Sequence, residues 1–504
     1  MSTDRYDAVV IGAGGGGLAA AARLALAGLK ILVLEQHNKI GGYMSSFKRG
    51  SYTFEVSLHN FDGLDPSIGM NTPVFKQLGI WNRVKNIRLE PAFNAVYPGS
   101  FFTIPAEPAL YQNYLIEQFP HEEKGIRKFF VTMEGMKTAL ALMRHHQEKD
   151  YIGLAGTLLK HPRWILPLIR YAPGTARKLL DDHFSDEKLK TLVAWLACYG
   201  GATQHKTSAA VLMGMIAAYH YGGWYYFEGG SQSVSNALGE VITENGGEIL
   251  LSKLATRIII KDGRARAVRT QDGSEYACRY VVSNANAPAT INQMAGREYF
   301  TKKFLNKMDA LEIGPPCVCV YLGVARDYRK YFKGAHTIVM SERWTVPEDF
   351  DMMVDSEPHT TDMILANYSV VDSTCAPPGK NVIVLVAALS YDYEKGWKKQ
   401  ESRKKYNQLK QDVAEILIRR AEAHLPGLSE HIEKMEVATP LTMERYTLNP
   451  KGSIIGWGLT SLNRLPARTP VKNLFLAGAW QSVGGQSPVL ASGLKTANKI
   501  IRQQ

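Results

Sequence analysis

The opening stretch of the chain joins two apolar runs through a helix-forming run. Residues 7–11 and 30–34 are short and apolar, which is typical of parallel strands buried on both faces. Between them, residues 19–27 consist almost entirely of helix formers. This pattern predicts a strand, a helix and a second strand at the start of the chain.

The pattern then changes along the chain. Residues 64–224 read as an inserted, largely helical region with a hairpin at 93–105. Further strands are predicted at 248–251, 257–260, 265–270, 280–285, 317–325, 363–370, 382–389 and 474–479. Longer helices are predicted at 234–245, 401–424 and 489–502. Strands therefore predominate after the helical insertion.

The glycines that follow the first strand have the G-x-G-x-x-G spacing. Gly12, Gly14 and Gly17 permit a tight turn, close backbone approach to a pyrophosphate and close helix packing. Glu35 ends the second strand, about 20 residues later, where an acid binds ribose hydroxyls. The glycine motif alone is weak evidence, but the complete strand–helix–strand context predicts a dinucleotide site.

Composition narrows the class of protein. A chain of 504 residues is long enough for two or three domains. Its content of 45% hydrophobic and 21% charged residues is typical of a globular protein. The net charge of +12 is dispersed and no nucleic-acid signature accompanies it, so a membrane surface suits it better than nucleic acid. The first strand leaves no room for a signal peptide, and five scattered cysteines predict a reduced, cytoplasmic protein.

A loop with paired glycines follows Glu35, at Gly41 and Gly42, and residues 52–59 then alternate between apolar and polar. With the opening unit, these features resemble the phytoene desaturase, carotenoid isomerase and retinol saturase group of flavoproteins. This chain differs from the group at two positions. Many members carry an arginine after the double glycine, where this chain has Tyr43, and a glycine is common where this chain has Ser57. The resemblance implies noncovalently bound FAD.

The expected fold is α/β, with a discontinuous Rossmann-like FAD-binding domain of three-layer ββα character, formed by residues 1–63, 225–290 and 466–504. The remainder is expected to form an α+β substrate domain, with a helical part at 64–224 and a part containing a mixed sheet at 291–465.

The motifs and the resemblance together assign the cofactor residues. In the resembled group, the last helix begins beside the flavin pyrimidine ring, and its N-terminus stabilises negative charge there. Trp480 replaces a usual acid, which alters the expected ribityl contact. The predicted FAD contacts are Gly12, Ala13, Gly14, Gly15, Gly17, Glu35, Gln36, Gly41, Gly42, Tyr43, Ala255, Asn284, Gly478, Ala479, Trp480, Ser487 and Val489.

No nucleophile triad, metal box or carboxylate pair stands out, so no metal is expected and the cofactor should carry the chemistry. The resemblance implies a lipophilic polyene, carotenoid- or retinoid-like, and leaves desaturation, saturation and isomerisation open, with an unidentified electron donor or acceptor. His59 is either a proton donor or a histidine hydrogen-bonded within its loop. Glu55 either caps a loop, the interpretation we favour, or lies near the flavin.

Other interpretations remain open at this point. A flavin amine oxidase has the same fold, as does a prenyl-protein escort protein, which binds lipid without flavin chemistry. Residues 151–171 are apolar but interrupted by charges and prolines, so they either lie in a membrane interface, giving a peripheral membrane protein, or form an ordinary surface helix. Tyr221, Trp224 and Tyr225 either line a substrate slot or belong to the core.

Overall fold

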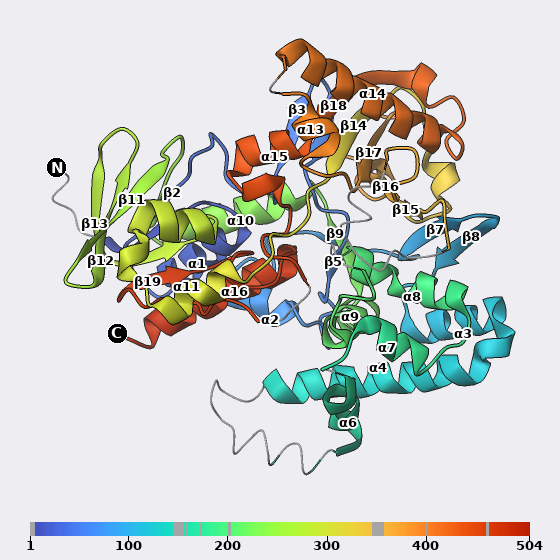
Figure 1. The fold of residues 1–504 in the computed structure, drawn as a ribbon, viewed down its shortest axis with the longest axis horizontal. Helices are drawn as coiled ribbons and strands as arrows, with labels where there is room; N and C mark the ends of the chain where they lie inside the picture. Colours follow the sequence, from blue (N-terminus) through green and yellow to red (C-terminus); the bar gives the residue numbers. More distant parts are fainter. Residues whose placement is uncertain are drawn as a thin grey trace.

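The computed structural model describes residues 6–144, 156, 160, 162–171, 173–199, 203–344, 357–399, 401–459 and 463–504. Two large sheets dominate the fold (Figure 1), with a group of helices beside the second sheet. The first sheet and its helices lie on the side of the molecule where both chain ends are found.

The first sheet is largely parallel and contains the predicted opening unit. Its strand order is β10-β2-β1-β13-β12-β11, and β19 also pairs with β13. The parallel strands are β1 (Tyr6–Ile11), β2 (Ile31–Leu34), β10 (Glu248–Leu250), β13 (Glu275–Ser283) and β19 (Leu474–Leu476). An antiparallel meander is formed with β13 by β11 (Ala255–Lys261) and β12 (Arg264–Thr270).

Alternate residues of β1 face two different layers. Ala8 and Val10 pack in one core with the helices α1 (Gly15–Ala25), α10 (Ser231–Glu244) and α16 (Gln486–Ile501). Val9 and Ile11 pack in another core with side chains of the meander. A helical layer, a parallel sheet and a β-meander therefore form the three-layer ββα arrangement that the sequence predicted.

The second sheet is mixed. Its order is β18-β14-β17-β16-β15-β7-β8, and only the β15–β7 pair within it is parallel. Its strands are β7 (Phe93–Tyr97), β8 (Ser100–Ile104), β14 (Val318–Val324), β15 (Thr337–Met340), β16 (Met363–Asn367), β17 (Asn381–Ala387) and β18 (Ile432–Ala438). The hairpin predicted at 93–105 is thus part of this sheet.

The helix α14 (Arg403–Glu422) covers one face of the second sheet. Leu409, Val413 and Leu417 of α14 belong to the same buried apolar cluster as Val320 and Leu322 of β14. On the other face of β14, Tyr321 packs in the larger core that also contains the helical layer of the first sheet. The two sheets therefore share a continuous apolar interior.

Two small sheets connect the large ones. One is the hairpin of β3 (Ser46–Arg49) and β4 (Tyr52–Glu55), and the other has the order β5-β9-β6, with β5 (Phe61–Asp62), β6 (Asn86–Arg88) and β9 (Trp224–Phe227). Trp224 and Tyr225 are buried in β9 and belong to the core. Shorter helices are α2 (Thr72–Gln77), α11 (Lys302–Asp309), α13 (Tyr393–Trp397) and α15 (Pro440–Thr447).

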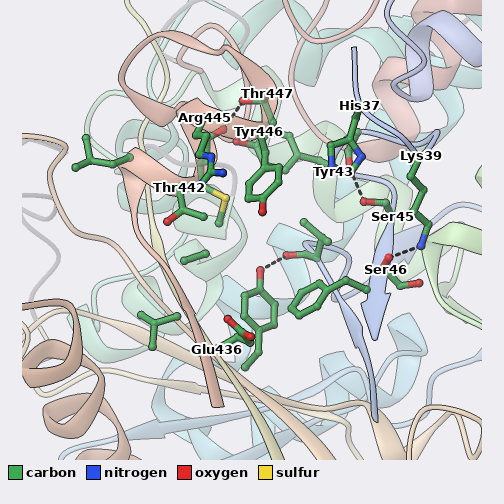
Figure 2. Close-up of a pocket in the computed structure, with 18 of the residues that line it drawn as sticks. His37, Lys39, Tyr43, Ser45, Ser46, Glu436, Thr442, Arg445, Tyr446 and Thr447 are labelled. Carbon is green, nitrogen blue, oxygen red and sulfur yellow. Dashed lines mark hydrogen bonds between the residues drawn. The ribbon is translucent and has the colours of Figure 1, made fainter. Parts of the chain in front are cut away.

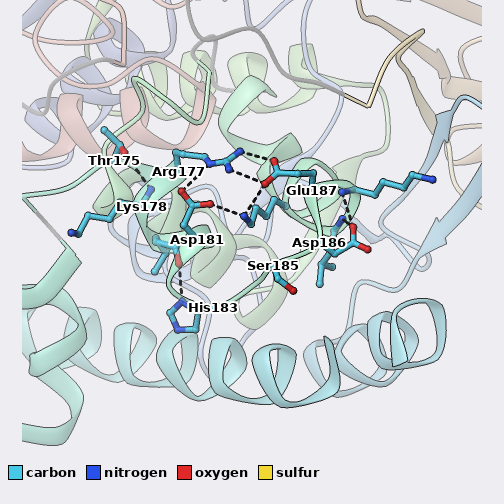
Figure 3. A network of polar contacts seen from close by, with 12 residues as sticks. Thr175, Arg177, Lys178, Asp181, His183, Ser185, Asp186 and Glu187 are labelled. Atoms are coloured by element: carbon cyan, nitrogen blue, oxygen red, sulfur yellow. Dashed lines mark hydrogen bonds and ion pairs between the residues drawn. The ribbon is translucent and has the colours of Figure 1, made fainter. Parts of the chain in front are cut away.

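The helical region comprises α3 (Pro108–Gln118), α4 (Glu123–Arg144), α6 (Pro162–Tyr171), α7 (Ala176–Asp181), α8 (Glu187–Tyr199) and α9 (Ala209–Ile216). An ion-pair network ties α7 to α8 (Figure 3). Arg177 pairs with Asp181 at 2.9 Å and Glu187 at 2.7 Å, while the nearly buried Lys190 pairs with Asp181 at 2.7 Å. Because several charges share these contacts, the network fixes the angle between two short helices.

Several predicted boundaries shift. The helix predicted at 489–502 begins earlier, at Gln486, and has Gly485 as its N-cap. The helix predicted at 19–27 begins at Gly15, because the glycine-rich turn forms its first helical turn. The strand predicted at 280–285 ends at Ser283 and starts in the meander, at Glu275. Asp262 and Gly263 both have positive φ and form the two-residue turn between β11 and β12.

Of the segment 151–171, the structure describes chiefly α6. The side chains of Trp164, Ile165 and Leu168, on which the membrane-interface prediction partly rests, lie outside the described residues, as does that of Cys198. The other four cysteines, Cys278, Cys317, Cys319 and Cys375, are buried thiols. None of the described helices combines the length and the apolar character needed to cross a bilayer.

Candidate cofactor site

The glycine loop joins β1 to α1, and each of its glycines meets a close neighbour. Gly12 has φ +90°, a conformation that other residues rarely adopt. A Cβ on Gly17 would lie 2.0 Å from the carbonyl oxygen of Gly12, so only glycine lets α1 begin this close to β1. Gly14 is the N-cap of α1 without a side-chain cap, which leaves N–H groups of the first turn available to an anion.

Asn284 fills the space that the glycines leave. Its side-chain Nδ2 would lie 2.8 Å from a Cβ on Gly14, and its Oδ1 would lie 2.2 Å from a Cβ on Gly478. The backbone N–H of Asn284 donates to the carbonyl of Ile11. Part of the glycine requirement therefore comes from packing Asn284 between the first loop and the C-terminal segment.

Glu35 stands at the end of β2, at the mouth of the loop. Its Oε2 accepts a 2.7 Å hydrogen bond from the N–H of Ala13, and its Oε1 a 2.8 Å bond from the N–H of His37. Burial raises the pKa of the Glu35 carboxyl, against the effect of these hydrogen bonds. The acid predicted to bind ribose is thus held against the glycine loop by backbone donors.

The second glycine pair lies directly against the first loop. Gly41 donates its N–H to the carbonyl of Ala13 at 2.8 Å, and both Gly41 and Gly42 have positive φ. The hydroxyl of Tyr43 donates to the carbonyl of Ser453 at 3.2 Å, and burial raises its pKa. Tyr43 therefore connects this loop to the segment that follows α15, whereas an arginine there would bring a charge.

The C-terminal helix α16 supplies the second half of the site. A Cβ on Gly16 would lie 2.5 Å from the Cα of Gly478, and a Cβ on Gly15 would lie 3.2 Å from Cγ2 of Val489. The first turns of α1 and α16 thus lie together, although about 470 residues separate them in the chain. The N-cap of α16, Gly485, also has no side-chain cap.

A buried carboxylate lies at the start of α16. Ser487 donates its hydroxyl to Oδ1 of Asp62 at 2.6 Å, and Asn71 donates to Oδ2 at 3.0 Å. Burial raises the pKa of Asp62. Asp62 belongs to β5, so its hydrogen bond with Ser487 fixes the beginning of α16 relative to the small sheet of β5, β9 and β6.

Gln486, the first residue of α16, provides a test of whether FAD fits here. Both polar atoms of its side-chain amide, Nε2 and Oε1, are buried and have no hydrogen-bond partner among the residues that the structure describes. A buried amide normally has partners, and a flavin pyrimidine ring offers both donors and acceptors. Together with the two uncapped helix N-termini and the acid at the end of β2, this orphaned amide matches FAD.

Some predicted contacts are already engaged within the protein. The indole N–H of Trp480 donates to Oδ1 of Asn449 at 2.9 Å, and the ring packs edge-on against Trp457. The side-chain N–H of Trp480 is therefore engaged within the protein, and the contact of Trp480 with the cofactor stays a prediction. Gln36 donates to the carbonyl of Tyr446 at 3.1 Å and holds α15 against the loop.

The remaining two predicted contacts are Ala255 and Ala479. Ala255 is the first residue of β11, opposite Thr270. Ala479 is partly buried and follows Gly478 directly. The resemblance assigns the backbone groups at Ala255 to the adenine, and both contacts stay predictions.

Glu55 acts as a cap. Its Oε1 accepts from the N–H of Leu58 at 3.1 Å and from the hydroxyl of Ser231 at 2.6 Å, and its Oε2 accepts from the N–H of Ser231 at 2.8 Å. Burial raises the pKa of Glu55. One side chain thus holds both the loop after β4 and the first residue of α10, in agreement with the capping interpretation.

His59 is buried against aromatic side chains. Its Nδ1 lies 2.9 Å from the hydroxyl of Tyr368, and its carbonyl accepts from Nε2 of His336 at 2.6 Å. Burial, with a smaller contribution from His336, lowers the pKa of His59 to about 3. The lowered pKa favours the neutral ring of His59, and its role as a proton donor stays a prediction.

The sequence did not indicate Asp62, Gln486 or Ser492 as parts of the site. Ser492 accepts from the N–H of Gly478 at 3.0 Å and donates to Oε1 of Gln481 at 2.6 Å, which fixes the last glycine turn. The sequence could have indicated Gln486, because this residue directly precedes the predicted contact Ser487. The sequence contained no indication of Asp62, because its partner Ser487 lies 425 positions later in the chain.

A protein-family model described as flavin containing amine oxidoreductase matches residues 16–501. Prolycopene isomerase from the chloroplast of Arabidopsis thaliana is 27% identical over 461 residues, which cover 89% of this chain and 74% of that protein. The neurosporene-forming phytoene desaturase of Rhodobacter capsulatus is 29% identical, over 98% of this chain and 93% of that protein. All-trans-retinol 13,14-reductase of Danio rerio is 23% identical, over 99% and 86%.

Among solved structures, an oxidoreductase from Methanosarcina mazei has a TM-score of 0.63 and 18% sequence identity. The match covers 97% of this chain and 99% of that one. At this level of identity, the likeness shows the fold, which agrees with the α/β architecture predicted from the sequence.

Proposed function

The chain belongs to the family of flavin-containing amine oxidoreductases and binds FAD, and on this basis we propose that it acts on carbon–carbon bonds of a lipophilic polyene, carotenoid- or retinoid-like. The observation that carries the proposal is that three relatives with such activities in their names each align with most of this chain. Bound FAD supplies the two-electron chemistry.

The residues of this chain position the cofactor and exclude water from it. The N-termini of α1 and α16 favour negative charge on the cofactor, and the amide of Gln486 orients the flavin ring. The aromatic residues of β9, which are buried beside Asp62, keep the surroundings apolar. Such an environment suits a substrate that carries no charge.

We propose an orienting role for His59. Its contact with Tyr368 fixes the loop between β4 and β5, and Asp62 of β5 bonds to Ser487 at the start of α16. His59→Ala should leave FAD bound but reduce turnover, and an unchanged rate would remove His59 from the mechanism.

Three reactions fit the proposal and differ in hydrogen balance. Desaturation removes two hydrogens from the substrate and requires an electron acceptor such as a quinone or oxygen. Saturation adds two hydrogens and requires an electron donor. Isomerisation leaves the hydrogen count unchanged.

An anaerobic assay separates them. Purified protein with oxidised or with reduced FAD is incubated with a linear carotene, with retinol and with a primary amine, and the products are weighed by mass spectrometry. Loss of two hydrogens from the polyene identifies desaturation, and gain of two hydrogens identifies saturation. An isomer with an unchanged hydrogen count identifies isomerisation. Turnover of the amine alone would instead favour amine oxidation, which the family name allows, and colourless protein that takes up no FAD would exclude both.

We also propose that α6 attaches the protein peripherally to a membrane, where a lipophilic substrate is dissolved. Leu166 and Ile169 of α6 are 59% and 60% exposed, and Arg170 lies beside them. Exposed apolar residues next to a cation suit a membrane interface. Leu166→Glu with Ile169→Glu should reduce co-sedimentation with anionic vesicles, and equal binding by the variant would refute this attachment.

A further inference from the structure

A cavity of about 990 Å³ lies between the loop after β2 and the substrate domain (Figure 2). His37, Lys39 and Tyr43 approach it from the loop, while Arg445 and Tyr446 approach from α15. β3, β18 and the first turns of α14 complete the walls. Its described lining shares Glu35, Gly42 and Tyr43 with the predicted cofactor contacts but includes none of Gly12 to Gly17 and no residue of α16.

The charges around this cavity are unbalanced. Its basic lining residues are Lys39, Arg49, Lys399, Arg403, Lys410 and Arg445, whereas its acids are Glu35 and Glu436. Glu436 pairs with Arg49 at 2.6 Å, and Glu35 is held by backbone N–H groups. Within the described part of the chain, no carboxylate pairs with Lys399, Arg403, Lys410 or Arg445.

Lys39 adds to this imbalance. Its ammonium group donates to the carbonyl of Ser46, and its pKa is lowered, chiefly by burial. A bound anion nearby would compensate for that burial. Glu55 partly offsets this burial by its charge, so the cations without a carboxylate partner in the described part of the chain are Lys399, Arg403, Lys410 and Arg445.

The interior of the cavity is apolar. Tyr321, Val437 and Met443 are buried, and Phe47 packs edge-on against Tyr321 with ring centroids 5.0 Å apart. Leu441 of α15 extends this surface. An apolar floor under a cationic rim matches a molecule with a hydrocarbon chain and a negatively charged end.

We propose that this cavity binds a small amphiphile with an anionic head group, a phosphate or a carboxylate, as a site separate from FAD. The head group lies among Arg403, Lys410 and Arg445, and the chain lies on Phe47, Tyr321 and Leu441. The cavity size suits such a ligand, because small-molecule sites usually measure about 300–1,000 Å³.

The experiment uses FAD-loaded protein and three probes below their micelle concentrations: dodecyl phosphate, inorganic phosphate and dodecyl maltoside. Calorimetry should show that dodecyl phosphate binds at least tenfold more tightly than either other probe. Its affinity should also fall as salt increases, because the rim cations are partly exposed. Equal binding of inorganic phosphate, or equal binding of the maltoside, would overturn the proposal.

Arg403→Gln combined with Arg445→Gln should weaken dodecyl phosphate binding at least tenfold. Arg419→Gln, on the exposed side of α14 and outside the cavity, is the matched control and should have no effect. Unchanged affinity of the double variant for dodecyl phosphate would overturn the proposal. Release of FAD in proportion to the ligand bound would also overturn it, because the cavity would then belong to the cofactor cleft. Since no turnover is measured, the outcome is independent of the reaction proposed above.

Discussion

At the residue scale, Gln486 has opposite effects on the protein with and without FAD. Its amide is buried and pairs with no described residue in the protein alone. Gln486→Leu should therefore stabilise the cofactor-free protein, since an unpaired buried polar group costs about 1–3 kcal/mol. The same change should weaken FAD binding about 2- to 10-fold, through loss of hydrogen bonds worth roughly 0.5–1.5 kcal/mol.

Thermal unfolding of the cofactor-free protein and equilibrium dialysis of FAD measure the two effects of Gln486→Leu. Gln408→Leu, on the exposed face of α14, is the control and should leave FAD affinity unchanged. Unchanged FAD affinity in Gln486→Leu would show that the amide does not contact the flavin.

Glu55 can be tested as a cap against a role in the reaction. Glu55→Gln replaces one acceptor oxygen by an NH₂ group, so one of the donors from Ser231 or Leu58 loses its partner. The free energy of unfolding should fall by about 1–3 kcal/mol, as measured by urea denaturation, while the turnover of folded enzyme persists. Full stability with lost turnover would instead assign Glu55 to the chemistry.

Individual site residues were predictable where their partners are close in the chain. Gly12, Gly17 and Glu35 follow from local spacing, because a strand, a turn and a helix form from neighbouring residues. Trp480 was assigned by its position after Gly478, but its direction depends on Asn449 in another segment. A sequence pattern locates a residue on an element and does not specify its distant partners.

At the element scale, the crossing of α1 and α16 depends on Gly493. A Cβ on Gly493 would lie 2.2 Å from the carbonyl oxygen of Gly16, so Gly493→Ala must separate the helices. The expected cost is about 1–3 kcal/mol of stability, measured by urea denaturation, with weaker FAD binding because both helix N-termini move.

Gly214→Ala is the matched control for Gly493→Ala. Gly214 lies in α9, where a Cβ would meet no atom within 4 Å, so alanine should stabilise the helix by about 0.5–1 kcal/mol. If Gly493→Ala also stabilised the protein and kept FAD, the helices would not depend on this close approach.

The types of most elements were predictable, but their assembly was less so. The period of apolar residues predicted α14, β14 and the meander correctly, because each buries one face or both. The hairpin of β7 and β8 was predicted within the helical region, yet β7 pairs with β15 some 240 residues later. Local pattern does not determine which strand edge another strand will join.

At the scale of the whole molecule, buried histidines should make stability depend on pH. His220 donates from Nδ1 to the carbonyl of Ala106, stacks on Tyr111 and meets Trp224 edge-on, and burial lowers its pKa to about 4. As the pH falls below 6.5, the unfolded chain binds a proton at this histidine before the folded protein does. Stability is therefore fully present above pH 6.5 and is lost progressively toward pH 4.

Replacing His220 by Gln should flatten this dependence. Between pH 6.5 and pH 4, the slope of unfolding free energy against pH should fall by up to about 1.4 kcal/mol per pH unit, the value for one proton. Urea denaturation at half-unit pH steps measures the slope, and His359→Gln, at an exposed position, should leave it unchanged. An equal slope in His220→Gln and wild type would mean that His220 takes up its proton in the folded protein as readily as in the unfolded chain. The acid sensitivity would then arise from other groups. The first to test are His59 and His336, because burial lowers their pKa values to about 3 and about 4.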